Sequence, residues 1–173
     1  MKYYNVIETQ YGWAGVVMNC DKISRFILPV PDRANLVSML QGIDEDDRPE
    51  LGTIDLSVTD QISAYFSGIP VEFSLQIDYT GARDFDMNVW EAARTIQYGT
   101  TVAYIELADM IGNRDACRAV GRALGRNPVP VIVPCHRILR TDGTLGGFSA
   151  GLPWKKILLD IERKGILTTG DRT

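Results

Sequence analysis

A cysteine, a histidine and an arginine stand side by side at residues 135–137, within the apolar, proline-broken stretch NPVPVIVPCHRIL. The thiolate is the nucleophilic form of cysteine, and nearby positive charge or a base favours its formation. Cys135 is therefore a better candidate nucleophile than Cys20 or Cys117, which we interpret as packing residues. Because neighbouring side chains on a strand point to opposite faces, Cys135 and His136 need a turn or a bridging water to act together.

The chain has three cysteines and one histidine. An odd number of cysteines without CxxC spacing does not indicate a disulfide framework. Structural zinc sites draw four ligands from Cys and His at short spacings, and this sequence does not offer them. We therefore expect no metal site.

A second candidate feature is a series of arginines at every fourth residue: Arg114, Arg118, Arg122 and Arg126. On a helix each lies about 40° around from the last, so the four form one basic stripe. Small residues between them, among them Ala119 and Gly121, let the helix backbone approach a groove closely. Such a stripe alone is typical of a solvated helix face, so its interpretation depends on the elements around it.

The 173 residues carry a net charge of −4, but the charge is uneven. Residues 1–80 hold five basic and twelve acidic residues, whereas residues 81–173 hold thirteen basic and ten acidic ones. Between residues 112 and 140 six arginines face a single acidic residue, so an anionic partner is expected there. No apolar run approaches the ~20 residues of a membrane span, and no signal-peptide-like segment follows Lys2, so we expect a cytoplasmic protein.

The apolar pattern predicts an α/β (α+β) chain with two domains, residues 1–80 and 81–173. The N-terminal domain is expected to hold a small antiparallel sheet with helices: strands within 7–30, helices at 32–41 and 59–67, a loop at 42–52, and a strand at 71–78. The C-terminal domain is expected to be mainly helical, with runs at 84–96, 100–111, 114–124 and 153–166, the last ending at Gly165. The tight Gly112-Asn113 turn between the second and third runs predicts a helix-turn-helix.

The stretch around Cys135, with ACRAVGRALGR before it and TDGTLGGFSAG and KKILLDIE after it, closely resembles the O6-alkylguanine-DNA alkyltransferases. The likeness is strong over residues 85–165 and weaker toward the N-terminus. It implies a DNA repair protein that moves the alkyl group from guanine O6 irreversibly onto its own cysteine, in a single turnover and without a cofactor. O4-alkylthymine stays open as a second substrate.

The resemblance also implies roles for individual residues. Cys135 accepts the alkyl group, His136 polarises a water that deprotonates it, and Glu162 orients His136. Asn127 matches the family's hinge asparagine, and Tyr104 matches the tyrosine that donates a proton or hydrogen bond to the departing guanine. The substrate pocket is expected from Tyr104, Val133, Pro134, Phe148, Ser149 and Ala150.

The family likeness gives the arginine stripe a partner, the minor groove of double-stranded DNA, bound by a monomer. Arg118 matches the residue that fills the gap left by a flipped nucleotide. Flipping is required because a protein thiol cannot reach O6 in line with the alkyl group while the base is stacked. The expected DNA contacts are Arg114, Arg118, Ala119, Gly121, Arg122 and Arg126.

The sequence departs from the family pattern at several positions: Phe148 in place of tyrosine, Gln97 in place of proline, Ala103 in place of serine, and GARDFD at residues 81–86. We expect these substitutions to affect the shape of the substrate pocket and the range of substrates rather than the reaction itself. Two other functions fit these motifs less well. Proteins that recognise alkylated bases without chemistry generally lack the cysteine of PCHR, which this chain keeps, and cysteine hydrolases need a distant base and an oxyanion hole.

Other conspicuous residues have ordinary interpretations. Trp90 and Trp154 are expected in the core. The basic residues of the last helix are expected on a solvated face: Lys155, Lys156, Arg163 and Lys164.

Overall fold

The computed structural model describes residues 2–43, 49–52 and 55–170, the side chains as far as residue 168. The chain divides into two compact units, residues 1–78 and residues 79–173. Within the described ranges, no helix has the length and apolar character needed to cross a lipid bilayer.

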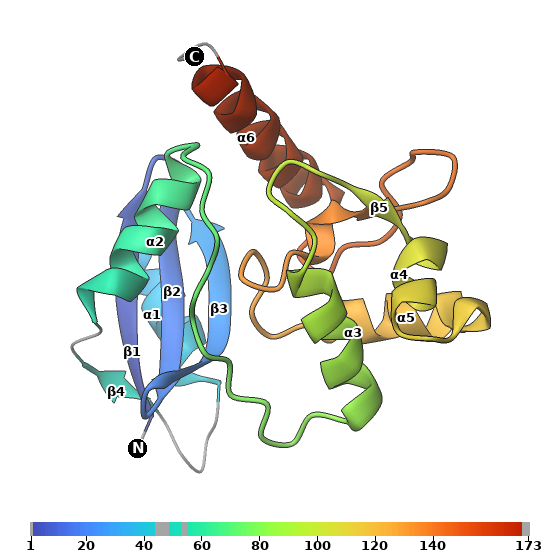
Figure 1. Cartoon of the computed structure of the whole chain (residues 1–173). Coiled ribbons are helices and arrows are strands. Elements are labelled where there is room, and N and C mark those ends of the chain that lie inside the picture. Colours follow the sequence, from blue (N-terminus) through green and yellow to red (C-terminus); the bar gives the residue numbers. More distant parts are fainter. Residues whose placement is uncertain (1, 44–48, 53–54, 171–173) are drawn as a thin grey trace. The chain divides into compact units, whose positions relative to one another are not determined.

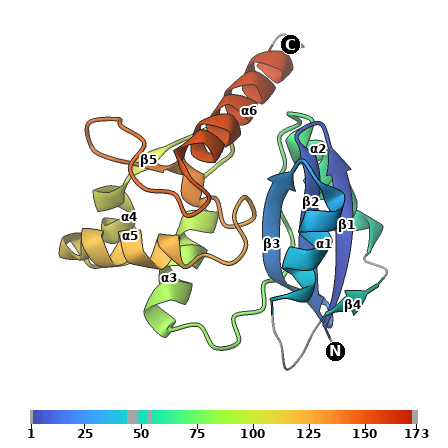
Figure 2. The ribbon, with the colours of Figure 1, turned by 180° about the vertical axis from the view of Figure 1, so that it is seen from behind.

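The first unit is a sheet with a helix on each face, as Figures 1 and 2 show from opposite sides (Figure 1, Figure 2). Its elements in chain order are β1 (Lys2–Thr9), β2 (Gly12–Asn19), β3 (Lys22–Val30), α1 (Arg33–Gln41), β4 (Glu50–Leu51) and α2 (Leu56–Phe66). The strands lie in the order β3-β2-β1-β4; β4 pairs in parallel with β1, and the other pairs are antiparallel. The antiparallel strands predicted within residues 7–30 are confirmed.

Both faces of this sheet are buried. Successive strand residues point to opposite faces, and Val16 and Val17 are nonetheless both inaccessible to solvent. On one face Val17 packs with Leu36 and Leu40 of α1. On the other, Phe66 of α2 stacks on Phe26 with the ring centroids 6.3 Å apart. Helices therefore cover a small sheet on both sides, which gives the unit its own core.

Several element boundaries in this unit differ from prediction. α2 begins three residues earlier than expected because the Asp55 side chain caps it by accepting a hydrogen bond from the Ser57 amide. The strand predicted at 71–78 is wrong: these residues contribute a single bridge, between Ile77 and Ile23. β4 was not expected within the loop at 42–52, of which residues 44–48 lie outside the described part of the chain.

The second unit is mainly helical (Figure 1). Its elements are α3 (Asp84–Arg94), β5 (Val102–Ala103), α4 (Tyr104–Met110), the 3-10 turn η1 (Arg114–Ala116), α5 (Cys117–Gly125), the 3-10 turn η2 (Cys135–Arg137), β6 (Ile138–Leu139) and α6 (Leu152–Gly170). β5 and β6 pair in parallel, Val102 with Ile138 and Ala103 with Leu139. This short ladder joins the start of α4 to the residues that follow η2.

The segment α4, turn, η1 and α5 is consistent with the predicted helix-turn-helix. Gly112 adopts a φ of 74°, in the left-handed region that glycine tolerates, and its amide closes the turn onto the Asp109 carbonyl. The third predicted run is not one continuous α-helix, because Arg114 lies in the 3-10 turn that precedes α5.

The prediction that α6 ends at Gly165 is wrong, since the helix continues to Gly170. A glycine inside a helix costs only about 1 kcal/mol. The buried Leu158 and Ile161 anchor the helix against the unit and offset that cost.

Candidate active site

Cys135 begins a buried 3-10 turn. Its side chain is 4% exposed, and its amide donates to the Val133 carbonyl over 2.8 Å. The amide of Arg137 donates to the Pro134 carbonyl over 2.9 Å, which closes the turn. Cys135 and His136 thus both lie on this turn.

Asn127 holds the loop that leads to Cys135. Its side-chain nitrogen Nδ2 donates to the Val133 carbonyl over 2.9 Å and to Cys135 Sγ over 3.2 Å, and its Oδ1 accepts from the Val129 amide. Within this loop Val131 has a φ of 77°, an unfavourable conformation for a β-branched residue. The loop therefore relies on its contacts, and Asn127 supplies three of them.

Glu162 of α6 forms hydrogen bonds with both residues that follow Cys135, His136 and Arg137. Its Oε1 lies 2.6 Å from His136 Nε2, and its two oxygens accept from Nε and Nη2 of Arg137 at 2.9–3.2 Å. Arg137 also donates to the Ile96 carbonyl. All three side chains are almost completely buried, with exposures of 0–5%.

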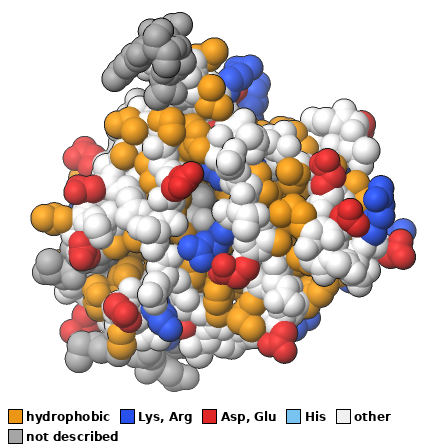
Figure 3. Space-filling view, viewed as in Figure 1, with side chains coloured by type: hydrophobic (Ala, Val, Ile, Leu, Met, Phe, Trp, Pro, Cys, Tyr) orange, Lys and Arg blue, Asp and Glu red, His pale blue; other side chains and the backbone are white. Residues whose placement is uncertain are grey.

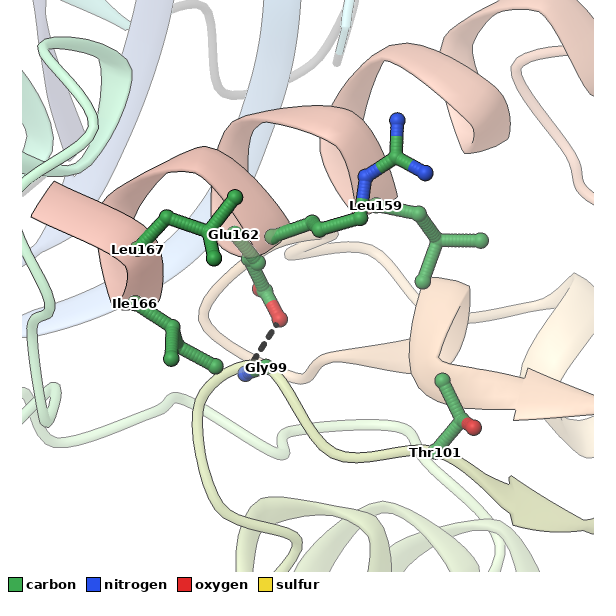
Figure 4. A pocket seen from close by; sticks show the side chains of 7 residues that line it. Gly99, Thr101, Leu159, Glu162, Ile166 and Leu167 are labelled. Atoms are coloured by element: carbon green, nitrogen blue, oxygen red, sulfur yellow. Dashed lines mark hydrogen bonds between the residues drawn. The ribbon is translucent and has the colours of Figure 1, made fainter. Parts of the chain in front are cut away.

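A fourth donor to Glu162 is a backbone amide. The amide of Gly99 donates to Oε2 over 2.8 Å, the contact drawn as a dashed line in Figure 4. Gly99 has a φ of 72°, and a Cβ there would meet Ile166 at 2.0 Å, so the position requires glycine. Gln97, which departs from the family pattern, still forms this turn, since its carbonyl accepts from Thr100. The same turn lines a cavity of about 340 Å³ with mostly apolar residues of α6.

The pKa values follow from this burial. Burial alone raises the pKa of Glu162, but its bonds to His136 and Arg137 outweigh that effect and bring the pKa to about 2. Burial lowers the pKa of His136, despite the opposing effect of Glu162. At neutral pH the site therefore holds a carboxylate and an uncharged imidazole, and the imidazole can accept a proton.

Burial raises the pKa of Cys135 to about 11, although the Asn127 hydrogen bond and the charge of Lys155 oppose the shift. The resting group is a thiol, which needs a base to become a nucleophile. The expectation that Arg137 would lower this pKa is wrong, because Glu162 neutralises Arg137.

Lys155 was missed by the sequence analysis, which placed it on a solvated face. It is fully buried, and its Nζ donates to the carbonyls of Ile138 and Gly147 at 2.6 and 3.2 Å. Nζ also lies 5.8 Å from the centre of the Tyr104 ring. Burial lowers the pKa of Lys155 to about 8. Helical spacing was the signal that could have found it, because Lys155 lies three residues before the buried Leu158 and seven before the buried Glu162.

A pocket of about 230 Å³ opens onto Cys135. Its lining in the described chain is Tyr104, Gly121, Leu124, Gly125, Cys135, Gly147, Phe148 and Ser149. Three of the six residues expected there take part, whereas Val133, Pro134 and Ala150 are not in this lining. The Tyr104 hydroxyl donates to the Gly147 carbonyl over 3.4 Å, and burial raises its pKa. A flat molecule entering this pocket would meet the thiol and the phenol together.

The arginines of the stripe are not equivalent. Arg118 and Arg122 are exposed on α5, and Arg114 is exposed with a distant 3.9 Å contact to Asp109. Arg126 is exposed as well, but it donates twice to Asp86. On the face shown in Figure 3, basic side chains are interspersed with acidic ones rather than gathered in one patch (Figure 3).

All three cysteines are free, and Cys20 is exposed whereas Cys117 is half-buried. Among the residues that the structure describes, no group of three or more Cys, His, Asp or Glu side chains is placed to hold a metal ion.

A mainly helical unit with a buried thiol, a hydrogen-bonded His-Glu pair and a pocket onto that thiol defines a class of thiol-dependent proteins. Comparisons with known proteins narrow the class. Residues 84–164 match the family described as 6-O-methylguanine DNA methyltransferase, DNA binding domain. A Bacillus subtilis protein, the constitutive methylated-DNA–protein-cysteine methyltransferase, is 33% identical over 94% of this chain and 96% of its own length.

The methylated-DNA–protein-cysteine methyltransferase of Mycobacterium tuberculosis is 45% identical over 66% of this chain and 68% of its own length. The crystal structure of the M. tuberculosis O6-methylguanine methyltransferase matches with a TM-score of 0.76 and 34% identity, over 95% of this chain and 94% of that one. The structure of the M. tuberculosis protein in complex with DNA matches with a TM-score of 0.79 and 34% identity, over 94% of each chain. The chain belongs to the methylated-DNA–protein-cysteine methyltransferase family.

Proposed function

We propose that this protein repairs DNA by transferring the alkyl group of O6-alkylguanine to Cys135 in a single turnover. The observation that carries the proposal is the position of Cys135, which lines a pocket and adjoins the buried His136–Glu162 pair. Membership of the methyltransferase family supports the same reaction. The chemistry uses side chains of this chain and one water molecule.

The first step is loss of the thiol proton. His136 Nε2 is bonded to Glu162, so Nδ1 is the nitrogen left to accept a proton, through a water that bridges it to Sγ. Glu162 stabilises the imidazolium that results. Asn127 and Lys155 stabilise the thiolate, because a hydrogen bond and a positive charge favour the charged form of Cys135.

In the second step the thiolate attacks the alkyl carbon. A carbon–sulfur bond forms as the carbon–O6 bond breaks, and the bonding electrons pass to the guanine. Tyr104 donates a hydrogen bond or proton to this leaving group, and its place in the pocket lining supports that role. The products are guanine and a thioether, so each protein molecule reacts once.

DNA is the partner in this proposal, as it is for the M. tuberculosis relative solved in complex with DNA. We propose that a monomer binds double-stranded DNA through the minor groove with α5, and that Arg118 occupies the gap left by the flipped base. The exposure of Arg118 and Arg122, and the small Ala119 and Gly121 beside them, support this docking. A cytoplasmic protein with access to the nucleoid fits this role.

The test is intact mass measurement and peptide mapping after mixing the protein with duplex DNA that carries one O6-methylguanine. We expect one added methyl group per protein, on the peptide that contains Cys135. A matched duplex with unmodified guanine is the control and should add no mass.

Binding without a change in mass would overturn transfer and favour recognition of the lesion without chemistry. Methylation on another residue would overturn the assignment of Cys135. A duplex carrying O4-methylthymine, used in the same way, decides whether that lesion is also a substrate.

A further inference from the structure

Asp86 is a buried carboxylate that the proposed mechanism does not use. It lies in the first turn of α3, within the GARDFD segment that departs from the family pattern, and it is only 3% exposed. Arg126 donates to it twice, from Nε over 2.8 Å and from Nη2 over 2.6 Å. This two-pronged geometry fixes the guanidinium plane as well as its distance. Arg83 adds a longer contact of 3.4 Å from the exposed side.

One turn further along α3, a second contact reaches the same place. The indole Nε1 of Trp90 donates to the Ala123 carbonyl over 2.9 Å. Asp86 and Trp90 are four residues apart, so they share one face of α3. Ala123 also accepts the amide of Arg126, which ends α5. α3 therefore contacts the end of α5 at two points. Asp86 binds the Arg126 side chain, and Trp90 binds the Ala123 carbonyl.

Arg126 adjoins the active-site loop. Arg126 is followed directly by Asn127, whose Nδ2 contacts Cys135 Sγ at 3.2 Å. The loop beyond Asn127 contains Val131 in its unfavourable conformation, so the loop keeps its shape only if its ends are held. A shift of Arg126 would move Asn127 relative to the sulfur atom.

We propose that Asp86 and Trp90 clamp the end of α5, so that Arg126 acts as a positioning residue for Asn127 and Cys135 rather than as a contact to DNA phosphate. The proposal rests on the function proposed above, since it concerns the same thiol. It assigns Arg126, whose side chain is 39% exposed, to this clamp in place of the DNA contact expected from the stripe.

The test compares wild type with Arg126→Gln and Asp86→Asn, each of which removes one charge of the clamp and preserves much of the side-chain shape. The first readout is the rate of alkylation of Cys135 by iodoacetamide as a function of pH, without DNA. We expect the profile of both variants to shift to higher pH by about half a unit, because a misplaced Asn127 no longer stabilises the thiolate. The other groups that face Cys135, namely Lys155, Tyr104 and His136, are unchanged in these variants.

The second readout is methyl transfer at saturating DNA. We expect a loss of about tenfold in rate in both variants, because small misplacements of reacting groups are costly, while DNA affinity changes little. The double variant should be no slower than the slower single variant, since both remove one clamp. Asp86→Glu retains the carboxylate and should recover part of the rate.

Arg94→Gln is the matched control. Arg94 pairs with Glu91 on the same helix at 3.0 Å, so the variant removes one charge of an ion pair on α3 as Arg126→Gln does at the clamp. This variant should leave both readouts at the wild-type values. Arg122→Gln, on the exposed face of α5, shows what loss of a DNA contact looks like and should weaken binding.

If Arg126→Gln weakens DNA binding as Arg122→Gln does and leaves the iodoacetamide profile unchanged, the clamp is wrong and Arg126 contacts DNA. If both variants lose thermal stability but keep the wild-type profile, the pair is merely structural and the proposal also fails. Because iodoacetamide needs no DNA, the clamp is tested even if wild type transfers no methyl group, a result that would overturn the proposed function instead.

Discussion

Two sets of charged side chains in the second unit differ in burial: one is buried and paired, and the other is exposed to solvent. The charges around Cys135 are buried, and each has defined partners: Glu162 with His136 and Arg137, and Lys155 with two backbone carbonyls. On α5, Arg118 and Arg122 project into solvent. The difference depends on whether a carboxylate or carbonyl lies within reach, since an unpaired buried charge is costly. Arginine therefore supports the active site in the first set, as Arg137, and is available to bind an anion in the second, as Arg118 and Arg122.

The largest effect should come from removing the buried nucleophile. Cys135→Ala should abolish methyl transfer, because no other thiol lines the pocket, and should leave DNA affinity close to wild type. Mass spectrometry and a binding titration with the same duplex measure the two properties separately. A variant that still acquires the methyl group would show that the buried set is not the reacting one.

Glu162→Gln should slow transfer by about 100-fold, because the imidazolium loses its anionic partner and His136 becomes a poorer base. The amide also leaves Arg137 without a counter-charge in the interior. Single-turnover kinetics at saturating DNA give the rate. An unchanged rate would mean that Glu162 supports the fold without taking part in the relay.

The lowered pKa of Glu162 predicts how the stability of the fold depends on pH. The pKa of Glu162 is about 2 in the folded protein, below its ordinary value, so the folded state binds this proton less readily than the unfolded state. Its contribution, roughly 3 kcal/mol, is complete above about pH 4.5 and is lost as the pH falls toward 2. Thermal melts between pH 6 and 2.5 should therefore fall more steeply for wild type than for Glu162→Gln. Parallel curves would contradict the assignment.

Lys155→Met keeps the length of the side chain and removes its charge. We expect the rate of transfer to fall by about tenfold, because a positive charge beside Cys135 favours the thiolate by an amount equivalent to roughly one pKa unit. With its pKa at about 8, Lys155 loses its charge as the pH rises above that value. The pH–rate profile of wild type should accordingly bend downward there relative to that of the variant, and two profiles of the same shape would argue against an electrostatic role.

The exposed set should show the opposite phenotype. Arg122→Gln should weaken DNA binding and lower the salt dependence of the affinity by about one unit of slope, while the thiol keeps its reactivity toward iodoacetamide. Arg118→Ala should weaken binding and base flipping in the same assay series. If either variant changes the iodoacetamide rate, the two sets are coupled and the comparison fails.

The smallest effect is expected at the other cysteines. Cys117→Ser and Cys20→Ser should transfer methyl groups as wild type does, since neither residue lines the pocket. A large loss in Cys117→Ser would instead indicate that the start of α5 takes part in recognition.

The sequence predicted the strands at 7–30 and the helical second half well, because their apolar periodicity is strong. It failed at 71–78, where the alternating residues meet β3 only at the bridge between Ile77 and Ile23, and at Gly165, where packing outweighs the helix propensity of one residue. For the site, the residue types around Cys135 pointed to a nucleophile, and the family resemblance supplied Glu162, Asn127 and Tyr104.

Sequence reasoning could not foresee which charges are paired or buried. Arg137, which is buried, and Arg126, which is exposed but paired with Asp86, were counted with the free arginines, and Lys155 with the solvated lysines. Their partners lie 25 and 40 residues away for the arginines and 17 and 8 for the lysine, so local spacing carries no trace of the pairing. A sequence signal was present for Arg126 alone: Asp86, the second of two aspartates in GARDFD, lies within a segment that departs from the family pattern.

The spacing of Lys155 and Glu162 along α6 sets a limit on how this chain can change in length. Seven residues make about two turns, so both side chains leave the helix on one face and reach β6 and η2 together. A single inserted residue between them would rotate one relative to the other by about 100°, and no local relaxation of a straight helix restores both contacts. Insertions and deletions should therefore be tolerated after Glu162, toward the C-terminus of α6, and not within the two turns before it.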